Sequence, residues 1–352
     1  MTKSWEAGLT LDFLHKRLGF DGDVYLSKSV DQIMPVSVSN ATGYYRKYVN
    51  AGTIQNKGIE LNLTAIPVQN KNFTWNISAN WTLNRNKVLS LYEGHKNLQL
   101  GAFQGGVTID AHVGQPYGVI EGNTYETLNA QGKVVPYSAT ADPHKRLVNK
   151  NGYYIMTSTY NNVIGNTNPD WQGGITNSFT YKNWSLSFLI SVSKGGSIFS
   201  LDQYYGQGDG IYPSSVGNNQ RGKPKRDPVS KGGGVLFTGM HSDGSPNTTY
   251  VEGDWYAQAG YAVQPNSQFV YDASYVKLRE VTLSYRFPKK ILRNTGIRSL
   301  TLGFVGSNLW IIFKNLPYAD PEAGLGAGNL QGWQSGVMPT TRNFGFNLNI
   351  KF

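Results

Sequence analysis

The stretch ITNSFTYKNWSLSFLI, residues 175–190, decides the fold because its apolar and polar side chains alternate. Successive side chains of a β-strand point to opposite faces, so this alternation indicates strands with one apolar face. A two-residue turn at Lys182 and Asn183 would join two such strands into an antiparallel hairpin. The pairs across that hairpin are then Tyr181–Trp184, Phe179–Leu186, Asn177–Phe188 and Ile175–Ile190.

The same alternation recurs along the whole chain. A hairpin around His15 and Lys16 would pair Trp5 with Leu26, and the residues between them fall into one apolar face and one polar face. A third hairpin joins 59–65 to 73–83, and its connection near 68–71 needs an odd number of residues and a bulge. Further alternating runs lie at 281–287, 300–304 and 344–352. The pattern predicts about nine strands of roughly 10 residues, the length that crosses a bilayer.

Composition excludes several classes of protein. The 352 residues include 41 Gly, 22 Tyr and no Cys, and only 15% are charged. Such an aromatic-rich, charge-poor chain does not resemble a disordered one, and a disulfide scaffold or a Cys-ligated metal site is impossible. The sequence contains no run of 18 apolar residues, so no transmembrane helix is predicted. Residues 1–6 lack the apolar core of a signal peptide.

The net charge of +10 does not indicate a nucleic-acid partner, because the basic residues are spread thinly and no recognition motif accompanies them. The densest cluster lies among Gly and Pro. It consists of Arg221, Lys223, Lys225 and Arg226. We interpret it as a solvated loop, with contact to anionic lipid head groups or an acidic ligand as the alternative.

The arrangement of connections favours a transmembrane barrel over a soluble β-sandwich. Short connections alternate with long ones, as in outer-membrane proteins with short periplasmic turns and long extracellular loops. The short ones are 15–16, 67–71, 182–183 and 288–298, and the long ones are 28–56, 85–172, 195–272 and 310–340. Aromatic residues near strand ends suit the membrane interfaces, namely Trp5, Trp75, Trp81, Tyr181 and Trp184. The chain also ends on an aromatic residue, Phe352. These features predict an all-β, antiparallel transmembrane β-barrel in contact with outer-membrane lipid.

An odd strand count places the two termini at opposite ends of the strands. With the short turns in the periplasm, the amino terminus lies outside the cell and the carboxy terminus inside. A hairpin hidden in 85–172 would leave the count odd. Bacterial single-chain barrels have even counts, and open sheet edges in hydrocarbon cost several kcal/mol per unpaired group. We therefore expect these strands to be only part of a barrel.

Five segments carry a family resemblance, in the same order along the chain. They are NAGTIQNKGIELNL (50–63), NPDWQGGITNSFTYKNWSLSFLISVSKGG (168–196), ASYVKLREVTLSYRFPKKIL (273–292), GSNLWIIFK (306–314) and DPE (320–322). Together they resemble the carboxy-terminal part of SusC/RagA-type TonB-dependent outer-membrane transporters. The opening stretch at 4–33 resembles the same family.

The resemblance implies a function in nutrient uptake at the cell outer membrane. It implies energised import of oligosaccharides or peptides, a SusD-like surface lipoprotein as a lid, and energy from TonB through an amino-terminal part. Residues 1–352 would then be the carboxy-terminal part of the barrel, with the plug domain and amino-terminal strands absent. Two alternatives stay open: a passive porin or adhesin formed by several chains, and a secreted carbohydrate-binding β-sandwich.

Catalytic and metal-binding patterns are not found in the sequence. The histidines have no close metal-ligand spacing, and they are His15, His95, His112, His144 and His241. The glycine-rich segment 207–210 has too few acidic neighbours for calcium, with Asp202 and Asp209 alone nearby. We therefore predict no enzymatic activity, no cofactor and no metal. The segments NPDW (168–171) and DPE (320–322) are interpreted as elements of turns and loop packing.

Aromatic residues in the long loops are the candidate ligand-binding residues. Aromatic faces beside amide and carboxylate groups suit sugar rings or peptide segments. The predicted set is Tyr204, Tyr205, Trp255, Tyr256 and Trp333. The alternative is that these side chains only pack the loops together.

Overall fold

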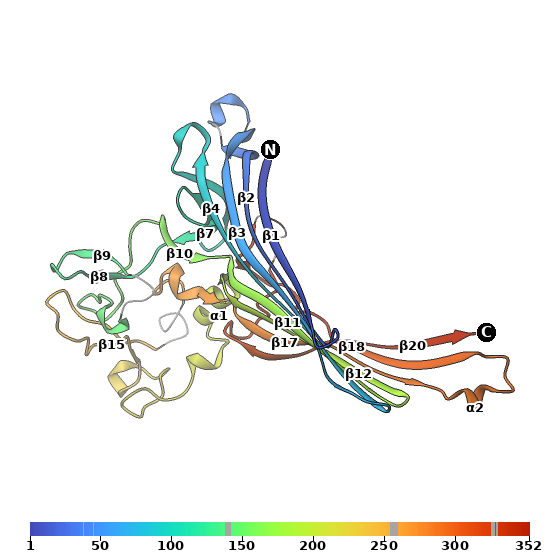
Figure 1. Ribbon diagram of the computed structural model, residues 1–352. Helices are drawn as coiled ribbons and strands as arrows, with labels where there is room; N and C mark the ends of the chain where they lie inside the picture. Colours follow the sequence, from blue (N-terminus) through green and yellow to red (C-terminus); the bar gives the residue numbers. More distant parts are fainter. Residues whose placement is uncertain (38, 45, 138–141, 254–259, 325–327, 329) are drawn as a thin grey trace.

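The dominant feature of the protein is one antiparallel sheet of nine strands, in the order β1-β2-β3-β4-β11-β12-β17-β18-β20 (Figure 1). The computed structural model describes residues 1–352 apart from 38, 45, 138–141, 254–259, 325–327 and 329. The strands are β1 (Thr2–Phe13), β2 (Leu18–Ser37), β3 (Arg46–Gln69), β4 (Phe73–Leu91), β11 (Pro169–Tyr181), β12 (Trp184–Gly195), β17 (Tyr275–Arg286), β18 (Ser299–Lys314) and β20 (Asn343–Lys351). No helix in the described part of the chain has the length and apolarity to cross a membrane.

The strand registers expected from the alternation are confirmed. Trp5 pairs with Leu26 across the first hairpin, and Ile175 pairs with Ile190 across the second. The first turn has φ of 56° at His15 and 64° at Lys16, the left-handed values that a two-residue hairpin turn needs. In the third hairpin the register shifts between Ala65 and Val68, so the expected bulge is present just before the turn.

Several strands are longer than expected. β2, β3 and β4 have 20, 24 and 19 residues, against an expectation of roughly 10. The prediction of a long loop at 28–56 is therefore wrong, because β2 and β3 stay paired out to Ser37 and Arg46. The outer parts of these strands lack a regular apolar face, so alternation does not reveal them. Trp81, expected near a strand end, lies inside β4 for the same reason.

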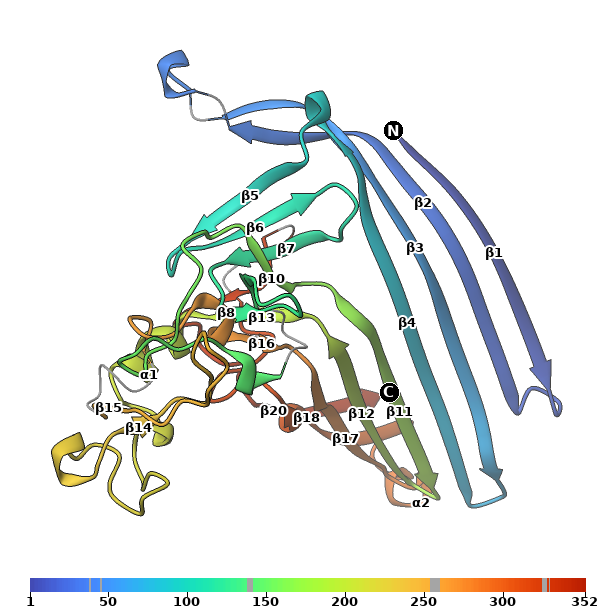
Figure 2. The same ribbon diagram turned by 90° about the vertical axis from the view of Figure 1, so that its left-hand side faces the viewer.

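The two ends of the sheet differ in their connections. The turns of the β1–β2, β3–β4 and β11–β12 hairpins lie at the same end of the sheet as α2 (Lys289–Leu292), and the longer connections lie at the other end (Figure 2). The amino terminus is at the long-connection end, where the amide of Val30 donates to the carbonyl of Met1. The carboxy terminus is at the opposite end, beside Ser299 at the start of β18. The termini are thus at opposite ends of the strands, as the odd count requires.

The nine-stranded sheet is open and exposes an apolar face. β1 pairs only with β2, and β20 only with β18, so both edge strands lack a second partner among the described residues. Exposed apolar side chains occur on every strand of the sheet, among them Trp5, Leu26, Leu63, Leu89, Ile175, Leu186, Leu283, Leu302 and Phe346. A β-sandwich buries this face against a second sheet, so that alternative is wrong for the described chain.

The long connections fold into a separate body beside one end of the sheet (Figures 1 and 2). A four-stranded sheet has the order β10-β7-β6-β5, and a three-stranded sheet has the order β16-β13-β19. Its strands are β5 (Asn97–Phe103), β6 (Val107–His112), β7 (Tyr117–Gly122), β8 (Glu126–Leu128), β9 (Val134–Pro136), β10 (Asn162–Asn166), β13 (Ser197–Ser200), β14 (Val235–Leu236), β15 (Tyr250–Val251), β16 (Val270–Asp272) and β19 (Trp333–Gln334). The helices of this body are α1 (Leu201–Gly208) and the 3-10 turns η2 (Tyr92–Gly94), η3 (Pro143–Lys145), η4 (Pro213–Ser215), η5 (Val229–Lys231) and η6 (Asn266–Phe269). The 3-10 turn η1 (Asn40–Thr42) lies at the tip of the β2–β3 hairpin (Figure 1). Among the described residues of 85–172, only the ends of β4 and β11 belong to the large sheet.

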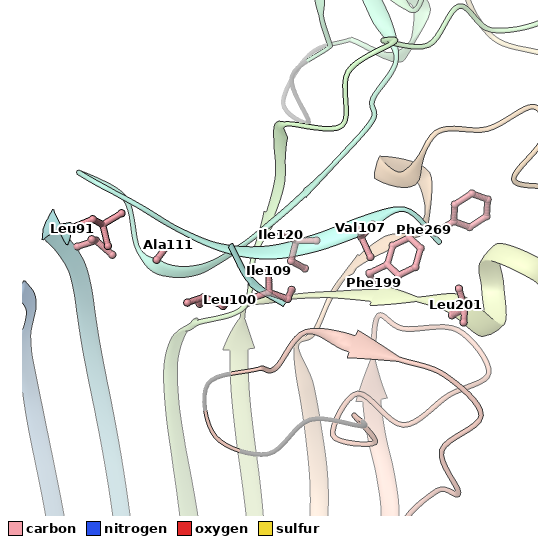
Figure 3. Close-up of a cluster of buried hydrophobic side chains, with 10 residues drawn as sticks. Leu91, Leu100, Val107, Ile109, Ala111, Ile120, Phe199, Leu201 and Phe269 are labelled. Atoms are coloured by element: carbon pink, nitrogen blue, oxygen red, sulfur yellow. The ribbon is translucent and has the colours of Figure 1, made fainter. Parts of the chain in front are cut away.

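The main hydrophobic core lies in this loop body (Figure 3). It joins the ends of β4 and β5 to β6, β7, β13, α1 and η6. Its buried members are Val88, Leu91, Leu100, Val107, Ile109, Ala111, Ile120, Phe199, Leu201 and Phe269. The large sheet contributes little to it because the apolar side chains of most of its length are on the exposed face. The loop body therefore has a core of its own, which can fix the shape of a binding surface.

A buried acidic group sits on the four-stranded sheet of this body. Asp110 is 2% exposed and Glu121 is 3% exposed, and Glu121 pairs with the imidazole of His112. Burial raises the pKa of the Asp110 carboxyl, and its Oδ2 atom has no hydrogen-bond partner among the described residues. Burial and the neighbouring Asp110 also raise the pKa of Glu121. A folded-state pKa above the unfolded value means that ionisation of Asp110 opposes folding at neutral pH.

We expect Asp110→Asn to stabilise β5, β6 and β7 at pH 7, because the neutral amide avoids the cost of burying an ionised carboxylate. The gain should shrink as pH falls and vanish well below the ordinary aspartate pKa of about 3.9, where the carboxyl is protonated in both the folded and the unfolded states. Amide hydrogen exchange of β6 at several pH values measures the effect. Slower exchange in the wild type than in the variant at pH 7 would contradict the account.

Candidate functional site

A cavity of about 300 Å³ lies where β11, β12 and β17 leave the large sheet for the loop body. Its polar lining comes from strand ends and from the loop that contains the DPE segment. The polar side chains are Thr167, Gln172, Ser193, Ser197, Tyr275, Glu322 and Gln331. Hydroxyl, amide and carboxylate groups converge there, so the cavity suits a polar ligand held by hydrogen bonds. It is our candidate binding site.

A buried ion network borders this cavity. The Lys277 side chain is 4% exposed, and its ammonium pairs with Asp320 and Glu322. Arg279 also pairs with Glu322, and its Nε atom donates to the Ser191 hydroxyl at 2.7 Å. These contacts join wall strands β12 and β17 to the DPE loop. The loop is therefore anchored to the sheet by a buried Lys277–Asp320 pair and by the partly exposed Arg279 and Glu322.

Tyr275 and Thr340 complete the network. The Tyr275 hydroxyl donates to Glu322 Oε1 at 2.6 Å, and the Thr340 hydroxyl donates to Asp320 Oδ2 at 2.7 Å. The network thus holds both the DPE loop and the segment that leads into β20. Because nearly every charge has an opposite partner, the cost of burying the charges is offset locally.

A β-bulge explains why Lys277 faces the loop body. Leu278 and Glu280 pair with successive residues of β12, so Arg279 is an extra residue in the ladder. Simple alternation would place Lys277 on the same face as Leu283, which is exposed. The extra residue reverses the face of everything before it in β17, and Lys277 becomes buried.

The charge state of the DPE loop is fixed at neutral pH. Burial would raise the pKa of Asp320, but the Lys277 ammonium and the Thr340 hydroxyl outweigh it and hold that pKa below its ordinary value. Arg279 and Lys277 likewise lower the pKa of Glu322 against the effect of burial. A lowered folded-state pKa stabilises the fold above the unfolded value and loses that effect only as pH falls through the folded value. The anchor is therefore intact at neutral pH.

Three of the five sequence-predicted ligand residues lie together in the loop body. Tyr204 and Tyr205 are on α1 with ring centroids 5.1 Å apart, and Trp333 is on β19. The side-chain amide of Gln104 donates to the Tyr205 hydroxyl, and the backbone carbonyl of Gln104 accepts from Trp333 Nε1. All three rings pack against the main core and are partly buried. Trp255 and Tyr256 lie outside the described residues.

The motifs interpreted as packing elements have different roles. Asn168 of NPDW donates to the Tyr117 carbonyl at 2.7 Å and accepts from Asn86, which is loop packing as expected. DPE does more than turn the chain, since two of its three residues carry the ion network. The available signal was the pair of cations two residues apart in β17 and the pair of acids two apart in the loop.

The remaining candidates stay outside the site. In the basic cluster, the Arg226 guanidinium donates to Gly210 and Ser215, and Arg221 stacks on the Tyr250 ring at 3.6 Å. The segment 207–210 closes α1. Among the described residues no group of three or more His, Cys, Asp or Glu side chains is arranged to hold a metal.

Comparisons with known proteins place this geometry in one class. The chain is 26% identical over its full length to TonB-dependent receptor P3 of Formosa agariphila, of which it covers 34%. It is 22% identical over its full length to TonB-dependent receptor SusC of Bacteroides thetaiotaomicron, of which it covers 32%. No protein-family model matches the chain.

Solved structures agree on the fold. The RagAB peptide transporter superposes with a TM-score of 0.67 at 20% identity, over 99% of this chain and 35% of that one. The RagAB peptide importer in the closed-closed state gives a TM-score of 0.68 with the same coverage. The chain thus spans about a third of the length of the proteins it matches.

The fold is a large antiparallel sheet with a loop body at one end, and it matches part of the RagA structure. The chain is homologous to TonB-dependent receptors of the SusC/RagA type over about a third of their length. This confirms the resemblance found in the sequence. Receptors of this family are outer-membrane transporters and not enzymes, in agreement with the predicted localisation and class.

Proposed function

We propose that the chain forms the carboxy-terminal wall and extracellular loops of a SusC-like importer of oligosaccharides or peptides. The observation that carries the proposal is the open sheet with an exposed apolar face and a built loop body at one end. Lipid covers such a face, and closing the barrel supplies the missing partners of β1 and β20. The cavity beside the ion network lies where a substrate entering the barrel first meets the wall.

The partners follow from the same proposal. A SusD-like surface lipoprotein would cover the loop body, and TonB would act through the plug-bearing part of the transporter. The loop body suits contact with a lid because it has its own core and is anchored to the wall through Lys277. The name of the RagAB peptide transporter supports peptides as one substrate class.

Periplasmic accumulation of labelled oligomers tests this function. Pools of oligosaccharides and of peptides, too large for general porins, are offered to cells with the intact gene, cells without it and cells without TonB. We expect at least one pool to accumulate only when both the gene and TonB are present. A complemented deletion strain is the control.

Two results would contradict the proposal. Accumulation that needs the gene but not TonB would support a passive pore formed by several chains. Accumulation that ignores the gene altogether would show that the chain has no role in uptake.

A further inference from the structure

A second cavity, of about 670 Å³, lies in the loop body beside the first and shares Ser197 with it. One wall is aliphatic and comes from β7, β10, β16 and the turn before β7. Its apolar residues are Pro116, Val119, Val163, Ile164 and Val270. The lining also includes Tyr125, Tyr137 and Arg146, together with polar side chains such as Thr124, Asn166 and Gln268. Apolar contact and a cation are therefore available to one ligand.

Among the described residues, Arg146 has no anionic partner. Its guanidinium carbon lies 4.2 Å from the centroid of the Tyr125 ring and 5.0 Å from that of Tyr137. No carboxylate of the described residues forms an ion pair with it, and its Nε atom is buried without a hydrogen-bond acceptor. A guanidinium presents five donors, and a buried donor left unpaired is costly unless a ligand or water satisfies it.

The tyrosines hold the guanidinium in place. Tyr125 is 2% exposed, and its hydroxyl donates to Gln264 and Gln268 at 2.5 and 2.7 Å. The hydroxyl of Tyr154, whose ring also lies within cation–π distance of Arg146, donates to the Thr238 carbonyl at 3.0 Å. Each of these rings is held by the backbone at one end and by its hydroxyl hydrogen bonds at the other, so together they form a rigid platform for the guanidinium. The arrangement is preorganised for a planar anion.

We propose that this cavity binds a carboxylate of a peptide substrate, with Arg146 as the anion-binding residue and the aliphatic wall contacting a neighbouring apolar side chain. The inference rests on the proposed import function and names its substrate class. A guanidinium pairs bidentately with a carboxylate. An acidic sugar is the less suitable ligand, because Arg146 already lies over the Tyr125 ring, so few aromatic faces remain for stacking.

Binding of matched peptides tests the assignment. The detergent-solubilised protein that contains this chain is titrated with a blocked pentapeptide that has a central glutamate between leucines, and with its glutamine twin. Trigalacturonate serves as the acidic sugar. The variants are Arg146→Gln, Arg146→Lys and Arg221→Gln; Arg221 also stacks on a tyrosine but lies outside the cavity.

We expect the glutamate peptide to bind the wild type at least about 10-fold more tightly than its twin, the effect of a charge-assisted hydrogen-bonded pair. Arg146→Gln should abolish the preference, Arg146→Lys should keep part of it, and Arg221→Gln should leave it unchanged. The partial preference of Arg146→Lys separates a lost anion site from misfolding.

Three outcomes would overturn the inference. They are equal binding of the two peptides by the wild type, a preference that survives in Arg146→Gln, and Arg146-dependent binding of trigalacturonate without the peptide. Equal binding leaves the import function intact. Uptake that ignores the gene contradicts the import function whatever the titration shows.

Discussion

Arginine at position 175 is expected to destabilise the inserted sheet by about 2–4 kcal/mol, the cost of a cation on the lipid face near the bilayer midplane. Ile175 is near the middle of β11, pairs with Ile190 and is 37% exposed. Folding of the purified protein into lipid vesicles in a urea series measures the difference. The reason for the loss is that no water or anion is available to the guanidinium on that face.

The adjacent residue provides the matched control. Thr176 follows Ile175 in the same strand and faces the opposite side, where it lines a hollow with Asn76 and Ser78. Thr176→Arg should therefore cost less than about 1 kcal/mol, because its charge can reach water inside the barrel. Equal losses for the two variants would contradict the assignment of faces.

Removal of the Lys277 ammonium is expected to produce the other large effect. Lys277→Met leaves Asp320 buried without its cation, a change that typically costs about 3–5 kcal/mol. The DPE loop should then detach from the wall, so amide exchange of residues 315–324 should accelerate strongly. Substrate binding in the adjacent cavity should weaken with it, since Glu322 lines that cavity.

Two further variants separate charge burial from simple loss of a lysine. In the double variant Lys277→Met and Asp320→Asn, the residue at position 320 carries no charge. Part of the protection of residues 315–324 from amide exchange should therefore return. Lys194 forms an ion pair with Asp272 at 3.6 Å, and both side chains are about half exposed. Lys194→Met should therefore change little. Loss of protection in Lys194→Met equal to that in Lys277→Met would contradict the account.

The large sheet could be predicted from the sequence because its strands and turns are determined by residues close together in the chain. Alternation fixed the faces, and the turn at 182–183 fixed the pairing of Ile175 with Ile190. These rules need only neighbouring residues, and a continuous apolar face makes them strict. They held for the inner parts of all nine strands, but not for the outer lengths of β2, β3 and β4, which have no regular apolar face, nor for β17 before its bulge at Arg279.

The site could be predicted only in part because long-range contacts and a bulge create it. Alternation along β17 predicts that Lys277 lies on the exposed face. It is buried because the extra residue Arg279 reverses the face of the residues before it. The partners of Lys277 are over 40 residues away in a loop. Arg146 is similar, because Tyr125 and Tyr137 reach it from separate segments. Aromatic content did locate the cluster of Tyr204, Tyr205 and Trp333, whose role in ligand binding stays a prediction.

Spin labels along β11 test the central claim most directly, which is that the large sheet is a membrane-embedded barrel wall. The chain has no cysteine, so each single-cysteine variant from 173 to 180 carries one label. In outer membranes, the account predicts that labels at 175, 177 and 179 collide with oxygen dissolved in lipid, and that labels at 176 and 178 collide with a water-soluble nickel complex. Access of the nickel complex to all of these positions alike would contradict the account.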